Sequence, residues 1–306
     1  MAPAVLVSEA AIPGARGPLA LLEAMRPRQW TKNVFVFAGI VFGGQLFEFG
    51  SVLRALGCFL GFCAAASAVY LVNDYVDRVN DSHHPIKRRR PIASGRLAGA
   101  TALISAAVLT LLAIAGTYAL SRDTMVILLL YLILSASYNA GLKSVFILDV
   151  LMVSAGFVLR AAAGAAAVHA EISPWLLCCT FLLALFLSLG KRRNELALLG
   201  DGAGTHRSAL QNYSVPLLDS WLTALTGATI VTYAIYTQSE RTVEHFKTTN
   251  LVYTVPFVIY ALFRYQHLVL REGAGGEPGS ALIHDRGMMI AIAGWAACAA
   301  FIIYSH

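Results

Sequence analysis

Residues 73–95 read NDYVDRVNDSHHPIKRRRPIASG and put three carboxylates and five Lys or Arg residues directly after an apolar run. If the helix that begins near Val52 continues through this stretch, Asn73, Asp77 and Asp81 lie at i, i+4 and i+8 on one face, with Asp74 on the flank. Carboxylates at this spacing repel one another unless a cation lies between them. Mg²⁺ suits the position, because it combines one or two carboxylates with substrate phosphate oxygens. The stretch therefore predicts a catalytic magnesium site with these four residues as candidate ligands.

The basic half of the stretch runs from Lys87 to Arg90 and is bracketed by Pro85 and Pro91. The prolines stiffen the loop, and its cations suit a polyphosphate, so Lys87 and Arg90 are candidate substrate-binding residues. The alternative interpretation is a solvated, charged helix end at a membrane surface.

Composition predicts a polytopic membrane protein of the all-α class. Hydrophobic residues make up 58% of the 306, charged residues make up 13%, and the mean hydropathy is +0.66. An apolar stretch of about 20 residues crosses a bilayer. Nine candidate spans result, near residues 34–49, 52–72, 99–120, 124–140, 145–168, 172–190, 214–237, 250–270 and 286–304.

Lys and Arg residues are distributed unequally between the two predicted sides of the membrane. With nine spans and a cytoplasmic N-terminus, 18 of them lie on the cytoplasmic side and four on the other. This asymmetry predicts a membrane protein with the N-terminus on the cytoplasmic side and the C-terminus outside. The net charge of +6 then faces anionic headgroups, so nucleic acid need not be invoked. Residues 1–25 are predicted to be a mobile tail before a single domain over 26–306.

Three further groups of ionisable residues are predicted on or near the cytoplasmic side. RPRQWTKN, residues 26–33, carries Arg28 and Lys32 one α-helical turn apart, which suits a lipid phosphate or a diphosphate. The alternative is an interfacial anchor, with Trp30 at headgroup level and cations that snorkel.

The second group follows the fourth span. Tyr138 and Lys143 lie in a short connection, and Asp149 and Arg160 lie inside the fifth span. Ionisable groups within a span are costly and usually face a polar cavity. Asp149 and Arg160 share a face but are about 16 Å apart along the helix, so each must find another partner, across the bundle or in a ligand.

The third group is KRRNE, residues 191–195, at the end of the sixth span. Lys191 and Glu195 are spaced i, i+4, with Arg192 between them. A positive-inside stop signal explains such a cluster, but its place beside the other groups favours a shared polar cavity that faces the cytoplasm.

The motif NDxxDxxxD, with the basic loop that ends RPIASG, resembles the first signature of the UbiA-type intramembrane prenyltransferases. The series Tyr138, Lys143, Asp149, Arg160 and Gly164 is similar to that superfamily, as is the predicted count of nine spans. The resemblance covers nearly the whole chain. The usual second motif of the superfamily is an Asp-rich DxxxD after the sixth span, and this chain has KRRNE in that position.

Together with RPRQWTKN, this departure resembles the branch formed by the decaprenyl-phosphate phosphoribosyltransferases. The resemblance implies Mg²⁺ as cofactor and transfer of 5-phosphoribose from 5-phosphoribose 1-diphosphate (PRPP) to a polyprenyl (decaprenyl) phosphate, giving decaprenylphosphoryl-5-phosphoribose for arabinan synthesis. The candidate substrate-binding residues are Arg28, Lys32, Lys87, Arg90, Tyr138, Lys143, Asp149, Arg160, Lys191, Arg192 and Glu195.

Two alternatives are weighed against this function. One is transfer of a prenyl group from its diphosphate to an aromatic acceptor, which a DxxxD at residues 191–195 would favour. The other is transport of an anionic lipid, against which the absence of a convincing internal repeat argues. The sequence leaves open whether the protein forms homo-oligomers.

Overall fold

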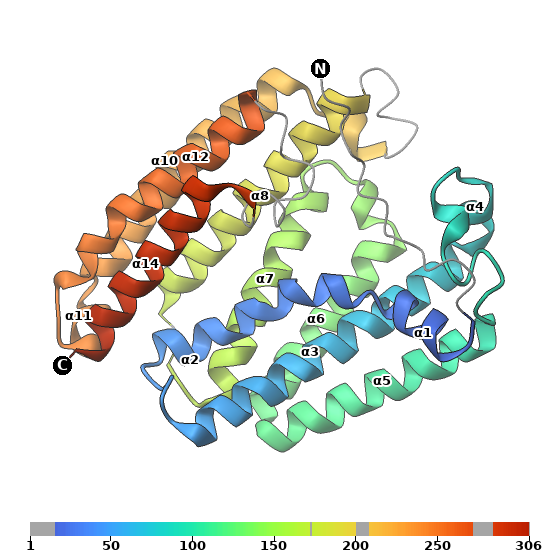
Figure 1. Cartoon of the computed structure of the whole chain (residues 1–306), viewed down its shortest axis with the longest axis horizontal. Coiled ribbons are helices and arrows are strands. Elements are labelled where there is room, and N and C mark those ends of the chain that lie inside the picture. The colour runs from blue at the N-terminus through green and yellow to red at the C-terminus, as the bar shows by residue number, and fades with distance from the viewer. Residues whose placement is uncertain (1–15, 172, 200–207, 272–283, 306) are drawn as a thin grey trace.

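The computed structural model describes residues 16–171, 173–199, 208–271 and 284–305, and within these ranges it contains helices and no strand. The predicted all-α class is confirmed. Figure 1 shows long helices arranged around α7 and α8, with α3, α5 and α6 in one group and α10, α12 and α14 in another. The elements are α1 (Pro18–Met25), η1 (Pro27–Phe37), α2 (Ala38–Phe42), α3 (Phe49–Val76), α4 (Arg78–His83), η2 (Lys87–Arg89), α5 (Gly99–Leu120), α6 (Arg122–Ala140), η3 (Leu142–Ser144), α7 (Leu148–Ala167), α8 (Pro174–Leu199), η5 (Ser208–Asn212), α10 (Val215–Gln238), α11 (Glu240–Phe246), η6 (Asn250–Thr254), α12 (Val255–Arg271) and α14 (Arg286–Tyr304).

Seven described helices, α3, α5, α6, α7, α8, α10 and α14, are long and apolar enough to cross a membrane. The predicted count of nine is not reached, for two local reasons. Residues 34–49 do not form one α-helix, because η1 is a 3₁₀ segment that passes into the five-residue α2. In the region of the eighth predicted span, α12 has only 17 residues after η6.

The stretch from Arg26 to Gln45, which includes η1 and α2, nevertheless runs beside α3 from near one end of that helix to near the other. At one end Arg26 contacts Asp74, and at the other Ser51 donates a hydrogen bond to Gln45. It crosses α7 at Gly164, where a Cβ atom would overlap the carbonyl oxygen of Val36. Only a residue without a side chain lets the two backbones approach so closely.

Helix α1 corrects the predicted extent of the N-terminal tail. Ala20 and Ala24 are buried against the core, and Glu23 accepts hydrogen bonds from Arg96 at 2.7 and 2.8 Å. Residues 18–25 therefore belong to the folded bundle, and the part of the predicted tail before residue 16 lies outside the described residues.

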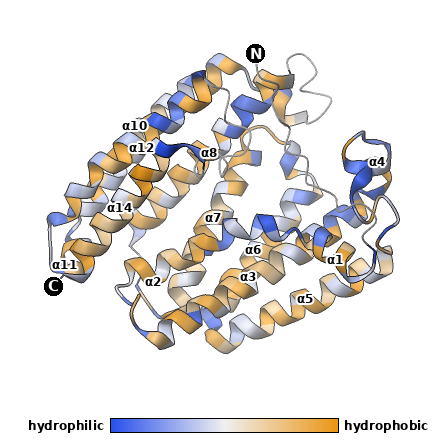
Figure 2. Cartoon of the chain, viewed as in Figure 1, coloured by the Kyte–Doolittle hydropathy of each residue, from blue (hydrophilic) through white to orange (hydrophobic). Residues whose placement is uncertain are grey.

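The acidic stretch is helical, with one interruption. Helix α3 ends at Val76 and α4 begins at Arg78, while the backbone N–H of Asp77 still bonds the Asn73 carbonyl and that of Asp81 bonds the Asp77 carbonyl. Figure 2 shows hydrophilic residues gathered on α4 and the nearby helix ends, whereas α5 is largely hydrophobic. The apolar helices thus place the polar motif at one end of the bundle.

Candidate functional site

Arginine side chains bridge two of the carboxylates in the acidic stretch. Arg90 Nη1 lies 2.7 Å from Asp81 Oδ2 and 3.1 Å from Asp74 Oδ1, and Arg26 Nη2 lies 2.7 Å from the same Asp74 oxygen. Asp74 and Asp81 are buried, with 2% and 4% of their surface exposed. Because seven residues make almost two full α-helical turns, these two carboxylates share a face more closely than Asn73 and Asp81 do. The placement of Asp74 on the flank is therefore wrong.

Asp77 is the most accessible carboxylate of the motif. A third of its side chain is exposed, and Lys143 Nζ lies 3.8 Å from its Oδ2 atom. Asn73 is half-buried one turn before it. Within the described ranges, no three His, Cys, Asp or Glu side chains converge closely enough to hold a metal ion by themselves.

The donor chemistry of this end of α3 nevertheless fits Mg²⁺. The candidate ligands are hard oxygen donors, and Mg²⁺ is usually held by one or two carboxylates, water and substrate phosphate rather than by an all-protein cage. Asp77 and Asp81 would supply the carboxylates and Asn73 an amide oxygen. Asp74, with both oxygens bonded by Arg26 at 2.7 and 3.0 Å, is better placed to orient arginines.

The basic loop divides into an inward and an outward part. Arg90 turns toward the aspartates, whereas Lys87, Arg88 and Arg89 form the short helix η2 and are exposed. The structure thus brings Arg90 to the acidic cluster and leaves Lys87 at the surface.

The KRRNE segment forms a second cluster with Asp149. Arg192 is 5% exposed, and its Nε donates to Asp149 Oδ2 at 2.8 Å, while its Nη1 lies 2.7 Å from Glu195 Oε2. Glu195 thus pairs with Arg192 rather than with Lys191, the residue four positions before it. Lys191 makes no ion pair with a described residue, and the Tyr138 hydroxyl lies within electrostatic range of Arg192.

A third cluster surrounds Arg160 inside α7. Its Nε donates to Asn33 Oδ1 at 2.7 Å and its Nη2 to the Tyr131 hydroxyl at 3.0 Å. The guanidinium also lies over the rings of Tyr131 and Phe157, at 4.7 and 5.2 Å. No described carboxylate lies within ion-pair distance of this buried cation. The prediction that Asp149 and Arg160 each find a separate partner is confirmed.

Contrary to the prediction, Arg28 and Lys32 do not lie on the same face. They lie in η1, where a turn takes three residues, so side chains four apart point about 120° away from each other. Both are exposed, and the neighbouring Trp30 donates its indole N–H to Ser67 at 3.0 Å. That bond fixes Trp30 inside the bundle rather than leaving it as a free interfacial anchor.

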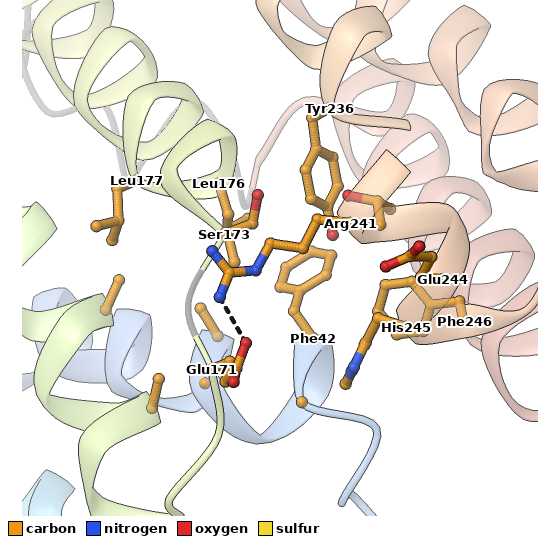
Figure 3. Close-up of a pocket in the computed structure, with 16 residues that line it drawn as sticks. Phe42, Glu171, Ser173, Leu176, Leu177, Tyr236, Arg241, Glu244, His245 and Phe246 are labelled. Carbon is orange, nitrogen blue, oxygen red and sulfur yellow. Dashed lines mark hydrogen bonds and ion pairs between the residues drawn. The ribbon is translucent and has the colours of Figure 1, made fainter. Parts of the chain in front are cut away.

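A cavity of about 240 Å³ lies at the opposite end of the bundle from the acidic cluster. Figure 3 shows Arg241 reaching across it to pair with Glu171, with Tyr236 and Phe42 on one side. The Glu171 side chain is largely exposed, and its hydrogen bond and charge interaction with Arg241 lower the pKa of its carboxyl group. The cavity predicted beside the acidic motif stays a prediction, because this cavity is at the other end.

Four site residues were missed from the sequence. Arg26 lies in RPRQWTKN, but an α-helical spacing favours Arg28 and Lys32 in that segment. Asn33, Tyr131 and Tyr213 contact site residues across long sequence separations and have no local signature. The polar Asn33 at the start of an apolar run was the one available signal.

Comparison with known proteins identifies the family. Residues 33–195 match the UbiA prenyltransferase family. The chain is 32% identical to a decaprenyl-phosphate phosphoribosyltransferase of Mycolicibacterium smegmatis, over 93% of this chain and 92% of the relative. It is 33% identical to the protein of that name from Corynebacterium glutamicum, over 93% and 86%. Its fold is similar to that of a UbiA homologue from Archaeoglobus fulgidus bound to GPP and Mg²⁺, with a TM-score of 0.71, 18% identity, and coverage of 93% and 99%. The chain belongs to the UbiA prenyltransferase family.

Proposed function

We propose that this protein transfers 5-phosphoribose from PRPP to a polyprenyl (decaprenyl) phosphate, with release of diphosphate. The observation that carries the proposal is the cluster at residues 191–195. The buried guanidinium of Arg192, anchored by Asp149, stands where other members of the superfamily are expected to have an Asp-rich motif. Cations there suit a donor that carries a 5-phosphate besides its diphosphate. The names and coverage of the relatives support the same activity.

The donor end of the site comprises the acidic cluster and the KRRNE cluster. Asn73, Asp77 and Asp81, with Asp74 behind them, would hold Mg²⁺, which when bound neutralises the negative charge that develops on the leaving diphosphate. Lys143 and Arg90 lie against these carboxylates and would contact the diphosphate oxygens. Lys191, Arg192 and Tyr138 would bind the 5-phosphate, with Glu195 and Asp149 orienting Arg192.

The acceptor end is assigned from charge and position. Arg160 is a buried cation held only by neutral groups, which is a costly arrangement inside a membrane span unless an anion is nearby for part of the cycle. Arg28 and Lys32 are exposed on η1, the segment that also carries Asn33, the partner of Arg160. Lys87 is exposed on the basic loop. These cations would guide the lipid phosphate, and apolar helix faces would hold its tail in the bilayer.

The reaction requires little proton transfer. A polyprenyl phosphate oxygen is already anionic, so it can attack C1 of the ribose as the C1–O bond to diphosphate breaks, without a strong general base. The described cluster accordingly offers cations and carboxylates rather than a His-centred catalytic pair. The product would be decaprenylphosphoryl-5-phosphoribose, a precursor for cell-wall arabinan, made at the cytoplasmic face of a bacterial inner membrane.

Prenyl transfer to an aromatic acceptor is the second candidate. The specific observation in its favour is the shared fold with a UbiA homologue bound to GPP and Mg²⁺. The test is a transfer assay on purified protein in detergent, with polyprenyl phosphate and radiolabelled PRPP, with and without EDTA. Label that enters the lipid extract only with Mg²⁺ present supports the proposal. If label stays in the aqueous phase while labelled prenyl diphosphate is consumed with an aromatic acceptor, prenyl transfer takes its place.

A further inference from the structure

Tyr213 occupies a junction between the two halves of the bundle that no motif indicates. It follows η5 directly, is 5% exposed, and donates its hydroxyl proton to Asp149 Oδ1 at 2.8 Å. The hydroxyl oxygen of Tyr213 also accepts a hydrogen bond from the backbone N–H of Ile147 at 3.1 Å. One hydroxyl thus uses both its donor and its acceptor capacity on the entry to α7.

The backbone that Tyr213 holds is in an unfavourable conformation. Ile147 has φ +69°, which is rare for a β-branched residue and is maintained only when its surroundings enforce it. The segment before it carries Lys143, whose ammonium lies 3.8 Å from Asp77. The hydrogen bond to Ile147 therefore fixes the turn that connects the acidic cluster to α7.

The other hydrogen bond of Tyr213 acts on the KRRNE cluster. Asp149 is fully buried and divides its oxygens, with Oδ1 bonded by Tyr213 and Oδ2 by Arg192 at 2.8 Å. Two donors on opposite oxygens fix the plane of the carboxylate, and that plane sets the direction of the Arg192 guanidinium. Tyr213 thereby influences the orientation of Arg192 through Asp149, without contacting Arg192 itself.

We propose that Tyr213 is a positioning residue for the phosphate-binding cations of the donor site, aligning Arg192 through Asp149 and Lys143 through the Ile147 turn. The inference rests on the proposed function, because it names PRPP as the molecule whose binding depends on this alignment. Tyr213 itself contacts no substrate.

The test compares Tyr213→Phe with Tyr265→Phe in the PRPP transfer assay. Phenylalanine keeps the ring contacts of Tyr213 with Phe146 and Trp221, at 4.7 and 6.2 Å, and removes only the hydroxyl. Tyr265 is the matched control, because it lies in the same apolar core cluster and its buried hydroxyl has no hydrogen-bond partner among the residues that the structure describes. Tyr213→Phe is expected to raise KM for PRPP about tenfold, the loss of one hydrogen bond to a charged group, with KM for polyprenyl phosphate within about twofold. Tyr265→Phe is expected to match the wild type.

A double-mutant cycle with Arg192→Ala separates positioning from general stability. If Tyr213 acts through Arg192, Tyr213→Phe in the Arg192→Ala background raises KM for PRPP by clearly less than tenfold. Full additivity, equal effects on both substrates, or kinetics identical to those of Tyr265→Phe would each overturn the inference while PRPP transfer by the wild type stands. A wild-type protein that moves no label from PRPP would overturn the proposed function, and this inference with it.

Discussion

The two ends of the bundle carry ion pairs of similar length in very different surroundings. Near the acidic motif, Arg26, Arg90, Asp74 and Asp81 form pairs of 2.7 to 3.1 Å, and at most a fifth of any of these side chains is exposed. At the other end, the side chains of Arg241 and Glu171 are 53% and 80% exposed. Distance alone does not distinguish the two regions, but burial does. An exposed pair contributes little to stability, whereas a buried pair leaves an uncompensated charge when one partner is removed.

The largest effect is expected from the two carboxylates that are proposed to hold Mg²⁺. Asp77→Asn and Asp81→Asn each should lower transfer about a thousandfold, because an amide cannot provide the charge that holds Mg²⁺ and offsets the leaving group. The measurement is label transfer by protein that elutes as a folded species in size-exclusion chromatography. Glu171→Gln, the same kind of change at the exposed end, is the matched control, and full activity in either aspartate variant would refute the metal assignment.

Arg90→Ala should have the largest effect on stability. It removes the cation between Asp74 and Asp81 and leaves two nearly buried carboxylates facing each other, at a cost of about 3 kcal/mol in the free energy of unfolding. The check is thermal unfolding in detergent, with Arg241→Ala as the counterpart at the other end. Equal shifts in Tm for the two variants would mean that burial does not separate the two ends.

A packing variant tests whether backbone contact, rather than ion pairing, holds η1–α2 against α7. Gly164→Ala should cost about 2 kcal/mol, because its methyl group would overlap the Val36 carbonyl. Gly116→Ala on α5 is the control, because a Cβ atom there meets nothing within 4 Å and alanine favours a helix. A neutral Gly164→Ala variant in thermal unfolding would show that the two segments can move apart.

The smallest effect on stability is expected from lowering the pH, which acts on the exposed Arg241–Glu171 pair. Because Arg241 lowers the pKa of Glu171, the pair stabilises the fold above the ordinary carboxyl pKa of 4.5, and its contribution is lost as pH falls through the lowered value. Between pH 7 and 5, Glu171→Gln should therefore shift Tm by a small, constant amount. A difference that grows over this window would place the pKa of Glu171 above its ordinary value.

Sequence patterns predicted the features that depend on local composition. The apolar lengths located the seven long helices, and the distance along α7 correctly required separate partners for Asp149 and Arg160. The identity of these partners could not be predicted from sequence patterns, because Asn33 is 127 residues from Arg160 and only packing brings them together. The pairing of Glu195 with Arg192 rather than with Lys191 has the same origin, since α-helical spacing allows both pairs and contact with Asp149 selects one.

The 3₁₀ segment η1 changes how much bilayer a short apolar stretch can cover. Eleven residues at the 3₁₀ rise extend about 22 Å, against about 16 Å for an α-helix of the same length. The difference is about one α-helical turn, so η1 and α2 together extend about 30 Å, which is the thickness of the hydrocarbon core of a bilayer. A length criterion calibrated on the α-helical rise therefore rejects a segment of this kind on residue number, although its extent matches the hydrocarbon core.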